Sequence, residues 1–125
     1  MITAAYEHRA ACTAAALAWM ALIFFLSSQA TLPLPPAIPG FDKIAHFGAY
    51  GVLGALLMFS MQPKQLSPWQ RVALVTLLVC TYGASDEFHQ SFVPGRDASI
   101  LDWVADGFGG FVAALILRDG GASSR

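Results

Sequence analysis

Charged side chains are scarce in this chain of 125 residues. Lys, Arg, Asp and Glu together make up 12% of it, against about 25% in soluble globular domains. Hydrophobic residues reach 56%, and the mean hydropathy is +0.57. This composition excludes an ordinary soluble domain and predicts a membrane protein, surrounded by the lipid bilayer. Because the net charge is only −1, the chain offers no basic surface, and no nucleic-acid partner is expected.

Cysteine is also rare. Cys12 and Cys80 each lie within an apolar run, where a disulfide between secreted loops is not expected, and we interpret both as buried thiols. The length suits one domain, residues 1–125, without a separate soluble module. The sequence carries no internal repeat and no cofactor-binding pattern, and it indicates no oligomeric state.

Four apolar segments have the length of membrane-spanning helices, which need about 20 residues to cross the hydrocarbon core. They cover residues 10–29, 42–61, 72–91 and 100–117. A proline-rich loop at residues 31–41 and a polar link at residues 62–71 separate the first three. The predicted fold class is therefore all-α, an integral membrane bundle of four transmembrane helices.

The first of these segments has a second interpretation. Arg9 precedes an apolar run that ends in the small-x-small tripeptide Ser28-Gln29-Ala30, a combination that resembles a cleavable signal peptide. Cleavage would remove one span and leave the other three unchanged. Both interpretations are compatible with the sequence.

The seven basic residues indicate an orientation, because cytoplasmic segments of membrane proteins are enriched in Lys and Arg. With the N-terminus inside, the cytoplasmic segments hold Arg9, Lys64, Arg71, Arg118 and Arg125. The outer loops then hold Lys43 and Arg96. The distribution predicts that both termini are cytoplasmic (N-in, C-in).

Polar chemistry is concentrated in residues 86–106, which contain five of the eight acidic residues, one of the three histidines and an arginine. In an N-in, C-in bundle this stretch meets the start of the second span at the outer leaflet. Ionisable residues inside a membrane point to a functional site. The predicted ligand-binding residues are Asp42, His46, Tyr50, Asp86, Glu87, His89, Gln90, Arg96, Asp102 and Asp106.

Helical spacing predicts how these residues are arranged. Asp42, His46 and Tyr50 recur every four residues and share one face, with Asp42 as an N-cap. Ser99 and Asp102 have the spacing of a capping box at the start of the fourth span. In the third span one stripe holds Tyr82, Gly83, Asp86, His89 and Gln90, with Glu87 beside it.

Small residues predict where helices approach closely. Gly48, Gly51 and Gly54 thin one side of the second span. Gly109 and Gly110 lie on the acidic face of the fourth span, which is therefore expected to pack against a neighbour.

The segments DKIAHFGAYGVLG and DEFHQSFVPGRDASILDWVADGFGG together resemble the VanZ-like family of small bacterial integral membrane proteins, over residues 41–111. The family pattern is Asp-Lys-x-x-His-x-x-x-Tyr, then Asp-Glu-x-His-Gln, then Pro-x-Arg with two later Asp residues. It falls here on Asp42, Lys43, His46, Tyr50, Asp86, Glu87, His89, Gln90, Pro94, Arg96, Asp102 and Asp106. Asn is common in the family at the last of these positions.

The resemblance implies a multi-pass protein of the bacterial cytoplasmic (inner) membrane. The family is named for a protein linked to low-level resistance to the glycopeptide teicoplanin, so a role in antibiotic resistance is a further implication. It names no ligand and no reaction.

Two interpretations of the polar residues involve no catalysis. In the first, Lys43 and Arg96 pair with nearby carboxylates in a structural network. Against it, the region holds more acids than two cations neutralise. In the second, the site binds an envelope lipid, wall precursor or amphiphilic antibiotic. Arg96 would hold a phosphate bidentately, and His46, Tyr50 and Gln90 would be hydrogen-bond partners.

A third interpretation is a membrane hydrolase that acts on a lipid phosphoester, with Glu87 or His89 as the base. The acidic and histidine side chains suffice chemically for a divalent metal. However, no His-x-x-x-His pattern is present and Glu87-x-His89 alone is a weak signature, so no metal is predicted. Transport is disfavoured, because no polar path reaches the cytoplasmic side. Binding is the favoured function, with no enzymatic activity assigned.

Overall fold

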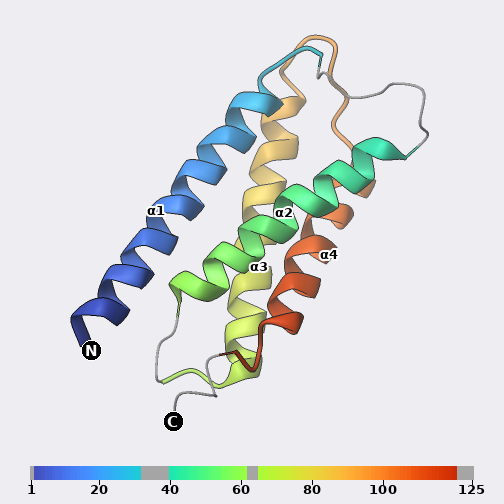
Figure 1. The fold of residues 1–125 in the computed structure, drawn as a ribbon. Helices are drawn as coiled ribbons and strands as arrows, with labels where there is room; N and C mark the ends of the chain where they lie inside the picture. Colours follow the sequence, from blue (N-terminus) through green and yellow to red (C-terminus); the bar gives the residue numbers. More distant parts are fainter. Residues whose placement is uncertain (1, 32–39, 62–64, 121–125) are drawn as a thin grey trace.

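The computed structural model describes residues 2–31, 40–61 and 65–120. It is all-helical, as predicted, with α1 (Ile2–Ser27), α2 (Phe41–Ser60), α3 (Pro68–Gln90) and α4 (Ile100–Ile116). Successive helices run in opposite directions, so the ends of α1 and α3 meet the starts of α2 and α4 at one end of the bundle (Figure 1). We call this the acidic end. Most of the predicted proline-rich loop, and Lys64, lie outside the described residues.

Two helices begin earlier in the chain than the apolar segments that predicted them. α1 starts at Ile2 rather than at residue 10, and α3 starts at Pro68 rather than at residue 72. Hydropathy marks the part of a helix that suits lipid, whereas polar residues can continue the helix beyond it. The early turns of α1 also contact α2, because Arg9 Nε donates to the carbonyl oxygen of Ser60 at 3.2 Å.

The start of α2 differs from the prediction. Gly40, not Asp42, is the N-cap, and Asp42 lies in the first turn. Gly40 has a left-handed φ of 78°, a conformation that glycine adopts without the clash a Cβ would cause. The chain can therefore turn sharply into α2 without a side-chain cap.

The predicted capping box of α4 does not form. The Ser99 side chain makes no cap hydrogen bond, and its backbone N–H donates instead to Glu87 Oε2 at 2.9 Å. A capping box is found at the start of α3, where Ser67 and Gln70 each satisfy the other's backbone N–H. The start of α4 is thus held by a carboxylate of α3 and not by its own side chains.

Glycines bring α2 and α4 together. A Cβ on Gly54 would lie 2.8 Å from the Gly110 oxygen, and one on Gly51 would lie 3.5 Å from the Gly109 oxygen. The close packing predicted for these positions is confirmed. Gly48 differs, since a Cβ there would meet nothing within 4 Å.

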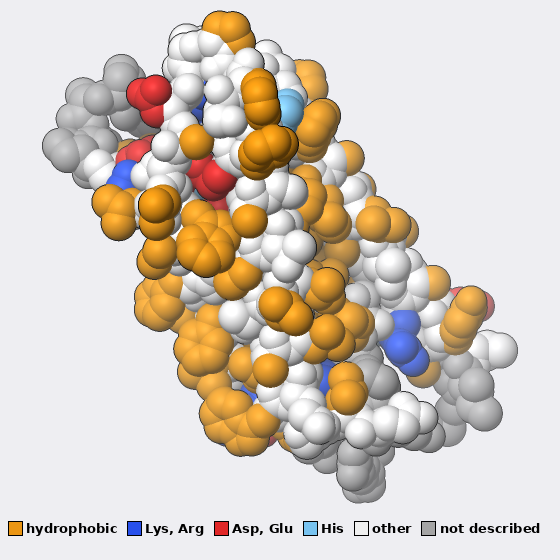
Figure 2. Space-filling view, turned by 180° about the vertical axis from the view of Figure 1, so that it is seen from behind, with side chains coloured by type: hydrophobic (Ala, Val, Ile, Leu, Met, Phe, Trp, Pro, Cys, Tyr) orange, Lys and Arg blue, Asp and Glu red, His pale blue; other side chains and the backbone are white. Residues whose placement is uncertain are grey.

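Hydrophobic side chains occur both inside and outside the bundle. The core joins α1, α2, α3 and α4 through Ala16, Ile23, Tyr50, Leu53, Met58, Val72, Val75, Val79 and Ala114. Large exposed hydrophobics lie on all four helices, among them Leu17, Ile44, Leu77, Phe108 and Ile116. Hydrophobic side chains extend along the face in Figure 2, and acidic side chains gather near one end of it. The predicted buried thiols, Cys12 and Cys80, are free but only half-buried.

Among the described residues, two helices have the length and apolar composition needed to cross a membrane, Thr3–Ser27 and Phe41–Ser60. The other two differ for identifiable reasons. α3 ends in the polar residues Asp86, Glu87, His89 and Gln90, and α4 has 17 residues. The features that make these two helices less apolar are those that form the site described next.

Candidate functional site

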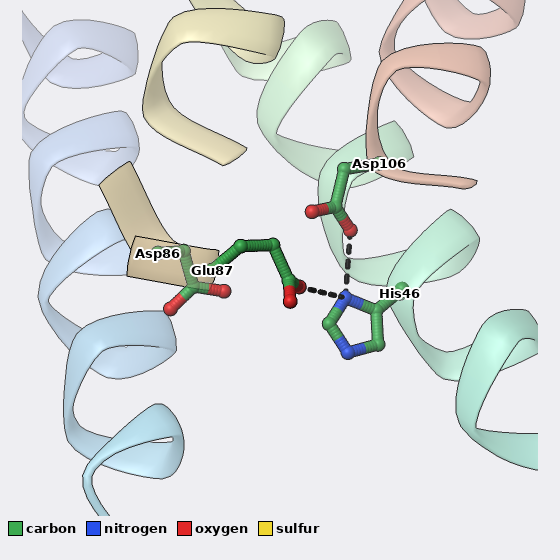
Figure 3. Close-up of side chains that lie close together, drawn as sticks. All are labelled: His46, Asp86, Glu87 and Asp106. Atoms are coloured by element: carbon green, nitrogen blue, oxygen red, sulfur yellow. Dashed lines mark hydrogen bonds and ion pairs between the residues drawn. The ribbon is translucent and has the colours of Figure 1, made fainter. Parts of the chain in front are cut away.

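Three helices bring four polar side chains together at the acidic end. His46 comes from the second turn of α2, Asp86 and Glu87 from the last turns of α3, and Asp106 from the second turn of α4. His46 Nδ1 lies 2.7 Å from Asp106 Oδ1 and 4.0 Å from Glu87 Oε1 (Figure 3). Asp106 is fully buried, and Asp86 and Glu87 are nearly so. We call these four residues the carboxylate cluster.

Each carboxylate of the cluster is held through one of its oxygens. Tyr50 Oη donates to Asp86 Oδ2 at 2.9 Å, and Gln90 Nε2 donates to the same atom at 3.3 Å. Glu87 Oε2 accepts from a backbone N–H, and Asp106 Oδ1 is paired with His46.

The second oxygens of two of these carboxylates have no such partner. Glu87 Oε1 and Asp106 Oδ2 are buried and make no hydrogen bond to any described residue. Leaving a buried polar atom unpaired costs about 1 to 3 kcal/mol. Such atoms are uncommon in folded proteins and call for an explanation.

Lys43 lies at the solvent-facing rim of the cluster. Its Nζ contacts Asp42 at 3.1 Å and Asp102 at 3.2 Å, so the predicted pairing of this lysine with nearby acids is confirmed. The side chains of Lys43 and Asp42 are 41% and 54% exposed, and exposed pairs contribute little to stability. Asp102 Oδ2 also lies 4.0 Å from His46 Nε2, which connects the rim to the cluster.

Arg96 has a different position from the one expected of a cation within an acidic network. Its Nη1 donates to the carbonyl oxygens of Gln29 at 3.1 Å and Leu26 at 3.4 Å. Among the described residues it forms no ion pair with a carboxylate. It connects the α3–α4 loop to the end of α1, where unpaired carbonyl groups attract a cation.

His89 lies outside the cluster. Its ring stacks on Phe24 of α1, with ring centroids 4.5 Å apart. Successive residues of a helix point about 100° apart, so Gln90 donates to Asp86 and to Ser27 of α1, while His89 points away from the cluster onto Phe24. Of the two residues considered as a catalytic base, only Glu87 is part of the cluster.

A pocket of about 460 Å³ lies beside the cluster, between α1, α2 and α3. Seven of the ten predicted ligand-binding residues line it: Asp42, His46, Tyr50, Asp86, Gln90, Arg96 and Asp102. Glu87, His89 and Asp106 do not. The pocket therefore opens onto part of the cluster, and the remainder lies behind it.

Sequence reasoning missed one wall of this pocket. Trp19, Leu22, Ile23 and Leu26 of α1 line it together with Ser27. Their spacing of i, i+3, i+4 and i+7 is that of one helical face, which was a usable signal. It was overlooked because α1 is apolar on every side. Trp19 Nε1 donates to the Ala49 oxygen at 2.8 Å and holds this wall against α2.

The cluster offers one imidazole and three carboxyl groups, which can exchange protons, form hydrogen bonds or bind a cation. One potential metal-ligating atom from each of its four residues lies within 4.8 Å of the others. No Ser or Cys belongs to the cluster, so it holds no hydroxyl or thiol nucleophile of its own.

Comparison with known proteins identifies the family. A family model described as VanZ/LLP1 matches residues 12–119, which include α1 from Cys12 onward, the whole of α2, α3 and α4, and every residue of the cluster. No curated protein and no solved structure matches the chain. Two of its helices are apolar enough to cross a bilayer, which together with the family match indicates a membrane protein. The chain belongs to the VanZ/LLP1 family.

Proposed function

We propose that this protein binds an amphiphilic molecule of the bacterial cell envelope in the pocket beside the carboxylate cluster. The observation that carries the proposal is the division of the pocket into two parts. One wall is apolar, formed by Trp19, Leu22, Ile23 and Leu26, and one end is polar, formed by residues such as Tyr50, Asp86, Gln90 and Arg96. An acyl or prenyl chain fits the first part, and a headgroup fits the second.

The polar end indicates the chemistry of the headgroup. Asp86, Asp42 and Asp102 supply acceptors for hydroxyl or amine donors, and Arg96 supplies a cation for an anionic group. Envelope lipids, lipid-linked wall precursors and acylated glycopeptides share this combination of a chain and a mixed headgroup. A volume of about 460 Å³ lies within the usual range of small-molecule sites.

The proposal includes four membrane spans with both termini in the cytoplasm of the bacterial cell. Exposed hydrophobics on all four helices support lipid contact by each. Arg9, Arg71 and Arg118 lie near the end opposite the cluster, as the positive-inside rule requires of a cytoplasmic end. The cluster and the pocket then lie at the outer leaflet.

Cysteine labelling tests this orientation. Asp97→Cys and Asp119→Cys are made separately after Cys12→Ser and Cys80→Ser. Asp97 and Asp119 are both exposed and belong to opposite ends of the bundle. A membrane-impermeant maleimide should label the first in intact cells and the second only after permeabilisation. The reverse pattern would place the pocket on the cytoplasmic side.

Ligand binding is tested by thermal unfolding of the purified full-length protein in detergent. Phosphatidylglycerol, phosphatidylethanolamine and teicoplanin are the probes. A ligand at 100 times its Kd stabilises the folded state by about 2.7 kcal/mol. Ala45→Phe, which fills the pocket from α2, should abolish the shift, and Ala84→Phe on an exposed face of α3 should not.

Two outcomes would argue against binding. If no probe shifts the wild-type transition and Glu87→Gln alone unfolds the bundle, the cluster serves as a structural network. If both Ala45→Phe and Ala84→Phe retain the full shift, the probe binds elsewhere on the protein.

A further inference from the structure

The four donor atoms of the carboxylate cluster are spaced as the ligands of one metal ion. They come from α2, α3 and α4 and lie within 4.8 Å of one another. Donors on opposite sides of an ion at about 2.1 to 2.4 Å are twice that distance apart, about 4.2 to 4.8 Å. All four atoms can therefore reach a common centre with little movement of their side chains.

The hydrogen bonds of the cluster leave the inner oxygens of the carboxylates available. Asp86 and Glu87 are anchored through Oδ2 and Oε2, while Glu87 Oε1 and Asp106 Oδ2 are buried without a partner among the described residues. Figure 3 shows the side chains of His46, Glu87 and Asp106 pointing toward one another, with Asp86 beside Glu87. Anchored carboxylates with free inner oxygens are typical of metal ligands fixed by outer hydrogen bonds.

The charge of the cluster also favours a cation. Three carboxylates and one imidazole have potential ligand atoms within 4.8 Å of one another, and Asp106 is fully buried. Of the described cations nearby, Lys43 pairs with Asp42 and Asp102 at the rim, and Arg96 donates to the end of α1. A divalent ion would supply the missing positive charge and satisfy both unpaired oxygens together.

We propose that His46, Asp86, Glu87 and Asp106 bind a divalent metal ion. One imidazole and three carboxylates suit Mn²⁺, Zn²⁺ or Fe²⁺ and disfavour soft ions such as Cu⁺. His46 Nδ1, which faces both Asp106 and Glu87, is the nitrogen ligand, and the ion takes the place of any proton on that atom. The site is distinct from amphiphile binding and does not depend on it, although His46 and Asp86 also line the pocket.

Metal binding is measured on the purified full-length protein in detergent, treated with chelator and then dialysed against Mn²⁺ or Zn²⁺. Elemental analysis should find about one ion per chain in the wild type, with Asp106→Asn and Glu87→Gln binding at least about tenfold more weakly. Asp97→Asn, which removes an exposed acid near the same end, should bind as the wild type does. His89→Gln provides the matched control for His46→Gln.

A spectroscopic readout tests the wild type directly, and folded variants then identify the nitrogen ligand. X-ray absorption of the zinc-loaded protein should show an all-nitrogen and oxygen shell with an imidazole contribution that His46→Gln abolishes and His89→Gln retains. The proposal is overturned if the wild type binds no ion at millimolar metal. It is equally overturned if folded Asp106→Asn and Glu87→Gln bind as tightly as the wild type.

Discussion

The two ends of the bundle both bury charged side chains, but among the described residues only the acidic end leaves buried carboxylate oxygens unpaired. At the end opposite the cluster, Arg71 is 8% exposed, and its guanidinium donates to the carbonyl oxygens of Met58 at 2.9 Å and Met61 at 3.1 Å. This arginine caps the C-terminal end of α2, where free carbonyls and the helix dipole attract a cation. Its role is accounted for by the fold alone.

At the acidic end the fold does not account for every polar atom. Glu87 Oε1 and Asp106 Oδ2 are buried without partners among the described residues, although neighbouring donors hold the other oxygen of each. Burial of charge is therefore common to both ends and says little about function. Unpaired buried acceptors distinguish the end where a ligand is expected.

The largest loss of stability is expected at the end opposite the cluster, where the buried arginine has all its partners. Arg71→Met leaves the carbonyl oxygens of Met58 in α2 and of its C-cap Met61 without a charged donor, and each such bond contributes about 1.5 to 3 kcal/mol. We expect the free energy of unfolding in detergent to fall by about 3 kcal/mol. Arg118→Met removes an exposed arginine that stacks on Trp69 and pairs with Asp119, and it should cost much less than Arg71→Met. Equal losses in the two variants would show that Arg71 is not a structural cap.

A smaller loss of stability is expected from a substitution in the α2–α4 contact, which lies between the two ends of the bundle. Gly54→Ala places a Cβ 2.8 Å from backbone atoms of Gly110, which cannot rotate away as a side chain could. The helices must separate, and we expect a loss of about 2 kcal/mol in the free energy of unfolding. Gly48→Ala, with nothing within 4 Å, should instead be neutral or gain up to about 1 kcal/mol from helix propensity. A tolerated Gly54→Ala would mean that the two helices are not in close contact.

Two tyrosines allow an effect on metal binding by the cluster to be distinguished from an effect on the stability of the bundle. Tyr50→Phe removes the hydroxyl that donates to Asp86, whereas Tyr82→Phe removes one that donates to the Met20 oxygen of α1. Each should lower the free energy of unfolding by about 1 kcal/mol. Only Tyr50→Phe should also weaken metal binding, by about tenfold in equilibrium dialysis. If both variants weaken it equally, the effect is a general loosening of the bundle.

The smallest effect on stability is expected from Asp106→Asn in the absence of metal. The substitution removes a buried charge and keeps an oxygen that can accept from His46, so the free energy of unfolding should change by less than about 1 kcal/mol. Unfolding is followed by circular dichroism in chelator. A loss as large as that of Arg71→Met would make the cluster a structural network and remove the distinction between the two ends.

The helices were largely predictable from the sequence because membrane-like helices have a strong local signal. The bounds predicted for α2 and α4 differ by one residue at most from those observed, since apolar composition and flanking turns mark both ends. The start of α1 was not predictable in this way, because its polar first turns remain helical through contacts such as Arg9 with Ser60. The cap of α2 at Gly40 was missed because an N-cap glycine acts through its backbone conformation.

The site was predicted in part. Helical spacing grouped Asp42, His46 and Tyr50 on one face, and His46 and Tyr50 do stack, with ring centroids 6.4 Å apart. Helical spacing also grouped His89 with Asp86, but its ring stacks on Phe24 of α1 instead. A stripe that spans several residues covers a wide arc of the helix, so its members can contact different neighbours. The α1 wall of the pocket was missed because α1 has no polar side against which the spacing of its lining residues stands out.

The sequence by itself determined the helical class, the apolar character, the family and the concentration of acids near one end of the bundle. The helical class, the apolar character and the grouping of acids follow from composition and local periodicity within single segments, and the family follows from its motifs. Only the tertiary structure decided which acids contact His46, which oxygens lack partners, and that α1 forms one wall of a pocket lined by Asp86. Such facts depend on the rotation and separation of α2, α3 and α4. Glycine contacts and long-range hydrogen bonds set those quantities between residues far apart in the chain.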